Sequence, residues 1–436
     1  MNVLTRITPD ADEQARMDAT VASILAAAQA AMDEAGLDGE ASVQGSVAKG
    51  TWLAGNTDID LFLLLDPATP QEALKDAAAT VGQAILDNPQ TKYAQHPYLI
   101  GTFQGYDVDL VPAYAVAAAG AHMSAVDRTP FHTRWVLDHS DTALRDDIRL
   151  AKKWCKGVEI YGADTATGGF SGYLVEVLVI AQGGFDGFIH WLSRPGRVAM
   201  GDDQVDDDVS PLVVVDPVDA ARNCAAAIHA DVLERATHAA TAYLADPSEA
   251  FFFPAPPRDE PEACQQALEG QGLAWIGLCM TPQTDRLDLV FPQFQRAART
   301  LSDAFERAGF QVLRHRVDEL DDVCMQWLVK DVELSATFPR QGPAPDKEPN
   351  ARKFRQKWQD NPDAAGPIEE VDGRLQVLVH RTARTPAAWL AQELPRFQGG
   401  KHVVAALKHH VIEGRPRASW APLVTDFILD RRPWQR

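Results

Sequence analysis

The sequence has few cysteines and no close cysteine pair. Five cysteines are scattered over 436 residues, and no two of them form a CxxC motif. This spacing argues against a zinc ribbon or a disulfide scaffold and is typical of proteins from a reducing cytoplasm. The five are Cys155, Cys224, Cys264, Cys279 and Cys324.

Long apolar runs are also missing. No stretch reaches the ~18 consecutive apolar residues that span a bilayer. The N-terminal segment lacks the apolar core of a signal peptide. We therefore expect a cytoplasmic protein that has no membrane partner. The sequence contains no internal repeat and no low-complexity segment, and its 436 residues with 46% hydrophobic content are enough for about three globular domains.

Positive charge is scarce relative to negative charge. The chain has 61 acidic and 41 basic residues, a formal net charge of −20. Acidic clusters such as 202–208 contain no basic residue. The negative charges on such a surface repel one another unless salt screens them. The screening length is ~3 Å at 1 M salt. We interpret the surplus as an adaptation to a halophilic cytoplasm; the alternative is an ordinary acidic protein.

The charge is unevenly distributed along the chain. Residues 351–436 contain 15 basic and 9 acidic residues, so this stretch has a net charge of +6 and the preceding 350 residues have −26. A basic C-terminal part suggests a polyanionic partner such as nucleic acid. The alternative is that these basic side chains balance acidic neighbours within the molecule. Charge alone leaves both interpretations open.

Hydrophobic periodicity predicts an α+β arrangement in the first ~140 residues. An Ala-rich helix is expected first, and an apolar strand follows a Gly-Ser turn. Two later strands, joined by Gln104-Gly105, read as a hairpin. The predicted elements are a helix over 11–35, strands over 41–46 and 58–65, a helix over 70–86, and strands over 98–103 and 106–111.

The remainder divides into a helical part and an α/β part. Helices are predicted over 138–157, 174–181 and 220–244. The segment 251–257 is predicted to be a boundary between domains. Beyond it a strand over 275–280, a helix over 292–309 and a strand over 311–317 alternate. We therefore predict an α+β domain with a mixed sheet over 1–140, a helical central domain over 141–256, and a C-terminal body and tail over 257–436.

Two pairs of aspartates follow a Gly-Ser turn. Asp58 and Asp60, and likewise Asp107 and Asp109, are separated by one residue within apolar strands. Residues i and i+2 of a strand point to the same face. Paired carboxylates suit Mg²⁺, and two such ions ~4 Å apart can stabilise an attacking hydroxyl and a leaving pyrophosphate. Gly45-Ser46 can approach a triphosphate. One pair alone is usually a solvated strand edge, but both together favour metal-dependent nucleotidyl transfer.

The segment from Gly45 to Asp60 resembles the signature of archaeal-type, class I CCA-adding enzymes, which are tRNA nucleotidyltransferases of the polymerase-β superfamily. The resemblance covers almost the whole chain in the same order. Its motifs are specific in the first 225 residues and looser in the last 180 or so. Further segments that carry it are 125–133, Lys152 with 160–163, 169–174, 216–219 with Arg222 and Asn223, 291–293, and 340–343.

The resemblance implies roles for individual residues. Asp58, Asp60 and Asp109 match the metal-binding carboxylates, although the first position is often Glu in the family. Asp107 would then not bind the metal itself but would support the residues that do. Arg222 matches the arginine that contacts the incoming base; its alternative is a helix-surface ion pair with Asp219. Contacts to triphosphate and ribose are implied for Ser46, Lys49, Thr129, His132, Lys152 and Tyr161.

The implied reaction adds C, C and A to the tRNA 3′ end from CTP and ATP and releases pyrophosphate, without a nucleic-acid template. The basic C-terminal part, with Arg296 and Arg299, would bind the acceptor stem and TΨC arm by shape and phosphate contacts; solvated helix arginines are the alternative. The oligomeric state stays open, with a homodimer as one option. Rival functions are another polymerase-β nucleotidyltransferase, such as a poly(A) polymerase or oligoadenylate synthetase, and a non-catalytic RNA-binding protein.

Overall fold

The computed structural model describes residues 2–93, 97–284, 287–320, 322–330, 332–415 and 417–436. These residues form two compact units. The first unit runs to Ala255 and also contains Pro433–Gln435, and the second consists of Pro256–Arg432 with Arg436.

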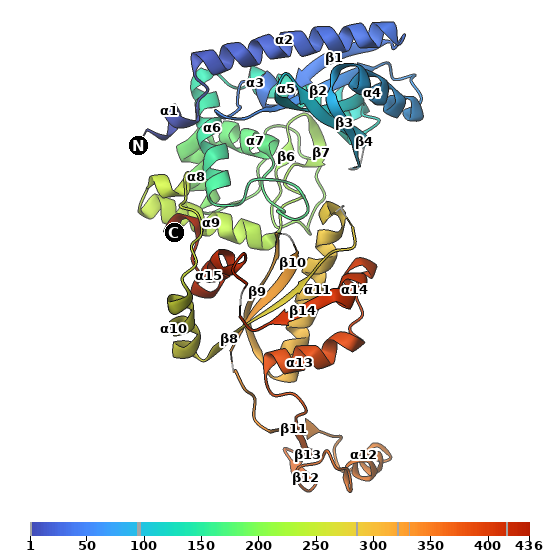
Figure 1. Cartoon of the computed structure of the whole chain (residues 1–436), viewed down its shortest axis with the longest axis vertical. Helices are drawn as coiled ribbons and strands as arrows, with labels where there is room; N and C mark the ends of the chain where they lie inside the picture. Colours follow the sequence, from blue (N-terminus) through green and yellow to red (C-terminus); the bar gives the residue numbers. More distant parts are fainter. Residues whose placement is uncertain (1, 94–96, 285–286, 321, 331, 416) are drawn as a thin grey trace. The chain divides into compact units, whose positions relative to one another are not determined.

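The first unit combines a sheet with many helices (Figure 1). Its helices are α1 (Val3–Ile7), α2 (Ala11–Glu34), α3 (Gly45–Lys49), α4 (Gln71–Ile85), α5 (Thr129–Asp138), α6 (Thr142–Gly157), α7 (Gly172–Gln182), α8 (Phe185–Leu192) and α9 (Ala230–Ala245). Its strands are β1 (Gly39–Gln44), β2 (Asp58–Leu65), β3 (Asp87–Tyr93), β4 (Pro97–Phe103), β5 (Tyr106–Tyr114), β6 (Val215–Asp216) and β7 (Asp219–Asn223).

The main sheet has the strand order β1-β2-β5-β4-β3. β2 and β5 are parallel, and the other neighbouring pairs are antiparallel. The predicted mixed sheet and the α+β class are therefore confirmed. Helices α2 and α4 contribute to the core on one face, where Leu61, Leu63 and Leu110 are fully buried. The other face carries a smaller apolar cluster around Phe62 and Ala113.

Local signals explain the elements next to the site. The Asp10 carboxylate caps α2 by accepting a hydrogen bond from the Glu13 amide at 2.7 Å. Gln104 and Gly105 both adopt positive φ, at 51° and 85°, as a tight β4–β5 hairpin requires. The predicted strand over 41–46 ends earlier than expected, because helix α3 begins at Gly45.

The helical part of the first unit surrounds a core of aromatic and aliphatic side chains. Trp154 of α6 and Phe188 of α8 are fully buried in it. The Phe251 ring stacks on Trp434 with the ring centroids 5.2 Å apart. The chain thus leaves this unit after Ala255 and returns to it for Pro433–Gln435.

The helix predicted over 220–244 is wrong over residues 220–229. Residues Asp219–Asn223 form strand β7, paired with β6, and α9 begins only at Ala230. The Asn223 side chain explains the difference, because its carbonyl oxygen accepts from the Val214 amide at 3.0 Å and from the Ala225 amide at 2.9 Å. Such side-chain bonds to the backbone compete with a helix and override the helical preference of neighbouring alanines.

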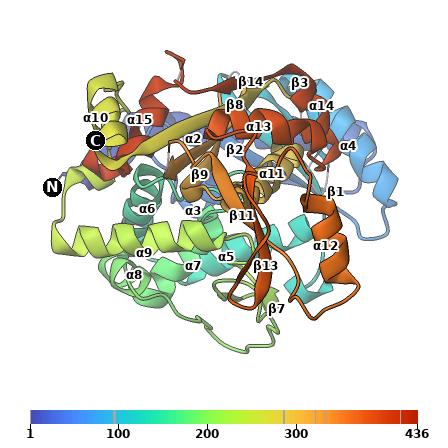
Figure 2. The same ribbon diagram turned by 90° about the horizontal axis from the view of Figure 1, so that it is seen from below.

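The second unit is built on another sheet, ordered β14-β8-β10-β9, and a small sheet, β11-β13-β12. Figure 2 shows α11, α13 and α14 grouped apart from α10 and α15. The elements are α10 (Pro261–Gln271), β8 (Leu273–Met280), α11 (Leu287–Ala308), β9 (Gln311–Glu319), β10 (Val323–Lys330), β11 (Thr337–Gln341), α12 (Asn350–Trp358), β12 (Glu369–Val371), β13 (Arg374–His380), α13 (Pro386–Glu393), α14 (Lys401–Ala406), β14 (His410–Glu413) and α15 (Ala421–Leu429).

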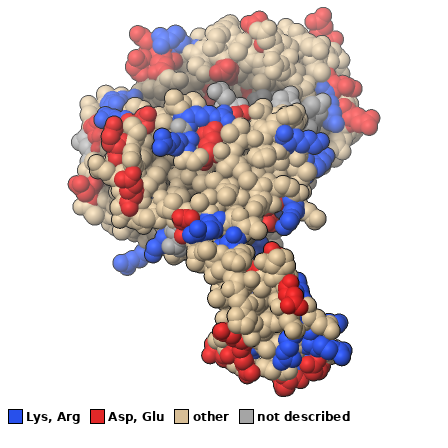
Figure 3. Space-filling view, turned by 60° about the horizontal axis from the view of Figure 1, so that its bottom comes forward, with Lys and Arg blue, Asp and Glu red and all other residues tan. Residues whose placement is uncertain are grey.

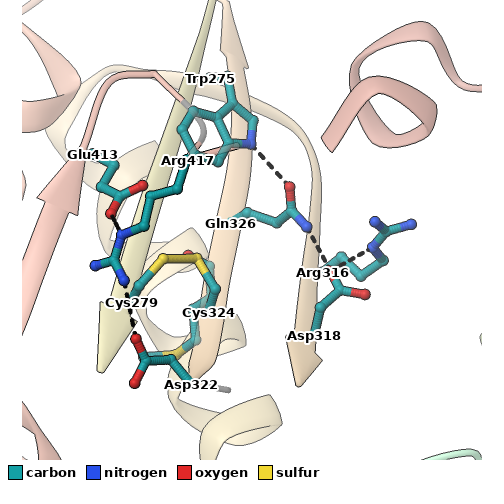
Figure 4. The surroundings of a disulfide bond; sticks show 10 residues. Trp275, Cys279, Arg316, Asp318, Asp322, Cys324, Gln326, Glu413 and Arg417 are labelled. Atoms are coloured by element: carbon teal, nitrogen blue, oxygen red, sulfur yellow. Dashed lines mark hydrogen bonds and ion pairs between the residues drawn. A yellow bond between two sulfur atoms is a disulfide. The ribbon is translucent and has the colours of Figure 1, made fainter. Parts of the chain in front are cut away.

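A disulfide joins Cys279 of β8 to Cys324 of β10, a pair that the cysteine spacing did not predict. The two residues are direct partners in the antiparallel register, although 45 residues separate them in sequence. Cysteine spacing therefore could not reveal the pair. Figure 4 shows the Arg417 guanidinium beside this disulfide, between the carboxylates of Glu413 and Asp322.

Among the described residues, no single helix has the length and apolar character needed to cross a membrane. Helices α7 and α8 meet those criteria only when taken together, across a bend of 101°. Most of their apolar side chains are buried in the core of the first unit.

Candidate active site

Four aspartates lie at the beginnings of β2 and β5. The parallel register places Asp58 opposite Asp107, and Asp60 opposite Asp109. Successive side chains of a strand point to opposite faces. The intervening Ile59 is buried in the core with α2 and α4. The aspartates therefore share the other face of the sheet, at the end where its apolar cluster stops.

Asp60 is the most enclosed of the four. Its carboxyl group lies so close to Gly45 that a Cβ at that position would overlap it, and Gly45 has a φ of +68°. Burial raises the pKa of Asp60; the Lys49 ammonium opposes this shift, and the Asp58 carboxylate adds to it. An added cation beside Asp60 would relieve the cost of keeping this carboxylate ionised.

The other three aspartates are exposed. The Asp107 carboxylate accepts a hydrogen bond from the Thr57 hydroxyl at 2.9 Å. In the part of the chain that the structure describes, no three His, Cys, Asp or Glu side chains are arranged to hold a metal ion. The backbone thus aligns the aspartates on one face, whereas their side chains do not form a ready-made ion cage.

Lys49 and Lys152 meet on a buried carboxylate that the sequence analysis missed. The Lys49 Nζ lies 2.6 Å from Glu176 Oε2, and the Lys152 Nζ lies 2.7 Å from Glu176 Oε1. The Thr51 hydroxyl donates to Oε1 as well, at 2.7 Å. Burial would raise the pKa of Glu176, but the Lys152 and Lys49 ammoniums lower it to about 2. The available signal was a lone charge within the apolar sequence of α7.

His132 and Arg222 meet on a second buried carboxylate, Asp216. Both His132 Nε2, at 3.0 Å, and Arg222 Nη1, at 2.6 Å, contact Asp216 Oδ2. The alternative interpretation of Arg222, a helix-surface ion pair with Asp219, is wrong, because Arg222 lies on β7 and Asp219 instead pairs with Arg128. Burial would raise the pKa of Asp216, but the hydrogen bond from His132 and the charge of Arg222 hold it below its ordinary value.

Three further predicted residues lie on neighbouring elements. Ser46 is in α3 and Thr129 is the first residue of α5, and both are partly buried. The Tyr161 hydroxyl lies against Gly172 at the start of α7, where a Cβ would approach it to 2.7 Å. The first unit also has a cavity of about 640 Å³. Its lining includes Ala163, Ser171, Asp207, Arg222, Asn223 and Cys224.

Family models match three successive parts of the chain. The Nucleotidyltransferase domain matches residues 27–132, the second domain of tRNA nucleotidyltransferase matches 146–253, and the C-terminal domain of the CCA-adding enzyme matches 282–414. The CCA-adding enzyme of Halobacterium salinarum is 35% identical over 398 residues, covering 90% of this chain and 88% of the relative. That of Methanoregula boonei is 36% identical, covering 99% of this chain and 95% of the relative. The chain belongs to the CCA-adding enzymes.

This membership confirms the predicted resemblance and the nucleotidyltransferase fold class, and it favours a CCA-adding enzyme over the rival functions. The similarity to Halobacterium and to Haloarcula marismortui, whose CCA-adding enzyme is 34% identical, supports the halophilic interpretation of the acidic surplus. Among solved structures, a cytoplasmic RNA terminal U-transferase aligns with a TM-score of 0.44 and 15% identity, over 57% of this chain and 95% of that chain.

In this CCA-adding enzyme, Arg296 and Arg299 are exposed on α11. Arg296 also lines a cavity of about 200 Å³ with Phe397 and Gly400. Several basic residues near the C-terminus form ion pairs within the second unit, as the balancing interpretation expects. Examples are Arg384 with Glu333, Arg431 with Glu260, and Arg436 with Asp426. Figure 3 shows Lys and Arg side chains interspersed with Asp and Glu on one face of the molecule.

Proposed function

We propose that this chain adds C, C and A to tRNA 3′ ends from CTP and ATP, with Asp58, Asp60 and Asp109 as the ligands of Mg²⁺. The observation that carries the proposal is the register of β2 and β5, which puts Asp60 opposite Asp109 next to Gly45. The hard carboxylate oxygens fit Mg²⁺. When bound, the ion supplies charge stabilisation for the attacking hydroxyl and for the departing pyrophosphate.

The residues of the chain have separate roles in this proposal. Asp109 lies nearest the terminal hydroxyl of the tRNA. Ser46, Thr129, His132 and Tyr161 contact the triphosphate and ribose, together with Lys49 and Lys152. Glu176 neutralises one of the two lysine charges, so Lys49, Lys152 and Glu176 together carry a net charge of about +1 beside Asp60. Arg222 presents N–H groups to the acceptor edge of cytosine or adenine.

The deciding experiment uses tRNA that lacks CCA, with labelled CTP or ATP supplied separately and then together. We expect CTP incorporation first and a stop after three additions, with no reaction on tRNA that already ends in CCA. Continued addition of one nucleotide would indicate a different nucleotidyltransferase. If Asp60→Ala or Asp109→Ala retained near wild-type incorporation, the assignment of the metal ligands would be wrong.

The second unit is proposed to bind the acceptor stem and TΨC arm. The combined change Arg296→Glu and Arg299→Glu reverses two exposed charges on α11 and should weaken tRNA binding while CTP binding stays unchanged. Lys75→Glu reverses one exposed charge on α4 and is the control for a charge reversal outside α11. Equal loss of tRNA and CTP binding in the α11 variant would contradict this separation of roles.

The division into domains over 1–140, 141–256 and 257–436, the cytoplasmic location and the homodimer remain parts of the proposal. Light scattering coupled to gel filtration measures the assembly state directly. A homodimer would have twice the 47.6 kDa mass of one chain, and a mass of one chain would exclude it under the conditions used.

A further inference from the structure

Asp216 accepts hydrogen bonds at both carboxylate oxygens from side chains on three different elements. At Oδ2 it receives Arg222 Nη1 at 2.6 Å and His132 Nε2 at 3.0 Å. At Oδ1 it receives the Tyr173 hydroxyl at 3.0 Å and the Val218 amide at 3.0 Å. The Asp216 side chain is fully buried. With both oxygens occupied, the carboxylate has little freedom to rotate.

This arrangement constrains the orientation of Arg222. A guanidinium group is planar and carries five N–H donors in a fixed geometry, so a bond at Nη1 restricts where the other donors can lie. Arg222 is 34% exposed in its side chain and lines the cavity of about 640 Å³. Asp216 is thus a buried acceptor that holds the Arg222 side chain at the edge of this cavity.

The same carboxylate also holds His132 of α5. The His132 ring stacks on the Tyr173 ring with the centroids 3.8 Å apart, and Tyr173 in turn donates to Asp216. Arg222, which is proposed to contact the base, and His132, which is proposed to contact the triphosphate, therefore share one acceptor, Asp216 Oδ2. Displacement of either donor changes the hydrogen bonding available to the other.

We propose that Asp216 is a positioning residue that sets base discrimination, by holding the Arg222 guanidinium in the orientation that accepts cytosine and adenine and rejects uracil and guanine. The proposal rests on the proposed function of CCA addition. Asp216 makes no contact with substrate in this assignment and acts through Arg222. A purely structural Asp216 would affect all four nucleotides equally, whereas a positioning residue changes their ratios.

The test compares kcat/KM for CTP, UTP, ATP and GTP in wild type and in Asp216→Asn. Asn carries no charge and has one acceptor atom in place of two, so it loses the ion pair with Arg222 and cannot accept from both Arg222 and Tyr173 as Asp216 does. We expect the CTP:UTP and ATP:GTP ratios to fall about tenfold or more, the effect of one mismatched buried polar contact. Asp219→Asn is the matched control: it removes a neighbouring ion pair with Arg128, at 3.2 Å, and should leave the ratios unchanged.

A double-mutant cycle identifies the route of the effect. In an Arg222→Ala background, Asp216→Asn should reduce the ratios no further. Unchanged ratios in Asp216→Asn, an equal loss for all four nucleotides, or a full additional loss without Arg222 would each overturn the proposal. If wild type itself adds no CTP to tRNA, the proposed function fails instead, which separates the two failures.

Tyr173→Phe provides a second variant in case Asp216→Asn does not fold, as judged by circular dichroism. It removes one donor from Asp216 Oδ1 and leaves the Arg222 bond in place. We expect a smaller reduction of the CTP:UTP ratio, about two- to fivefold, from the lost hydrogen bond. An unchanged ratio in a folded Tyr173→Phe enzyme would overturn the proposal.

Discussion

The Asp60 carboxyl group lies against the α-carbon of Gly45, in the space that any side chain at that position would fill. Gly45→Ala should therefore displace Asp60 and reduce nucleotide incorporation by at least a hundredfold, in addition to a cost of about 1–2 kcal/mol for a non-glycine residue at positive φ. Gly55→Ala is the control, because Gly55 has a φ of +77° with no atom near its Cβ position. It should lose similar backbone stability but keep activity. Equal activity in the two variants would contradict the assigned role of Gly45.

Asp107 and Asp109 share one face of β5 but should differ in their effect on catalysis. Asp109→Asn is expected to reduce incorporation by several orders of magnitude, since it removes a proposed metal ligand. Asp107→Asn should cost about tenfold or less, because Asp107 is not a proposed metal ligand and its carboxylate bonds to the Thr57 hydroxyl. Single-turnover incorporation at several Mg²⁺ concentrations measures both variants. A larger loss in Asp107→Asn than in Asp109→Asn would reverse the assignment.

Glu176 provides a prediction about stability and pH. Glu176→Gln leaves two buried ammoniums without their counter-charge, which should cost about 3–5 kcal/mol of unfolding free energy at neutral pH. The folded pKa of about 2 lies below the ordinary value of 4.5. The stabilisation by Glu176 is therefore complete above pH 4.5 and is lost as the pH falls toward 2.

Urea unfolding of wild type and Glu176→Gln between pH 7 and pH 2 checks this prediction. The difference between the two proteins should be largest near neutral pH and should shrink in acid. Glu234→Gln, on the exposed side of α9, serves as the control and should change stability by no more than about 0.5 kcal/mol. A difference that grows in acid would contradict the charge pairing.

Titration of free thiols can detect the disulfide between Cys279 and Cys324. Thiol titration of the denatured protein should find three thiols before reduction and five after it, because Cys155, Cys224 and Cys264 are free. Reduction should lower the unfolding free energy by roughly 2–4 kcal/mol. Cys264→Ser should leave the disulfide intact and should leave two thiols to titrate before reduction. Five thiols in the protein before any reductant is added would exclude the cross-link.

Salt should stabilise this protein. With a net charge of −20, screening by molar KCl reduces self-repulsion, so the urea midpoint should rise from low to molar KCl. A neutral osmolyte at matched osmolality tests whether the effect is electrostatic. Full stability at low salt would remove the halophilic interpretation.

Elements that depend on local signals were predictable. The apolar strand β2, the hairpin of β4 and β5 and the capped helix α2 each carry their pattern within a few adjacent residues. The period of two along β2 and β5 also put each aspartate pair on one face of its strand. The family motifs from Gly45 to Asp60 supplied the candidate residues, whose roles the proposed experiments address.

Contacts between distant parts of the chain were not predictable in this way. Lys49 and Glu176 are 127 residues apart, and Cys279 and Cys324 are 45 apart. Arg222 was expected on a helix because alanines favour one, yet Asn223 and the pairing with β6 impose a strand. Local sequence therefore decided which residue types were available and where most elements begin. Only the tertiary structure decided which buried carboxylate neutralises which cation, because that choice depends on burial and on partners that sequence proximity does not reveal.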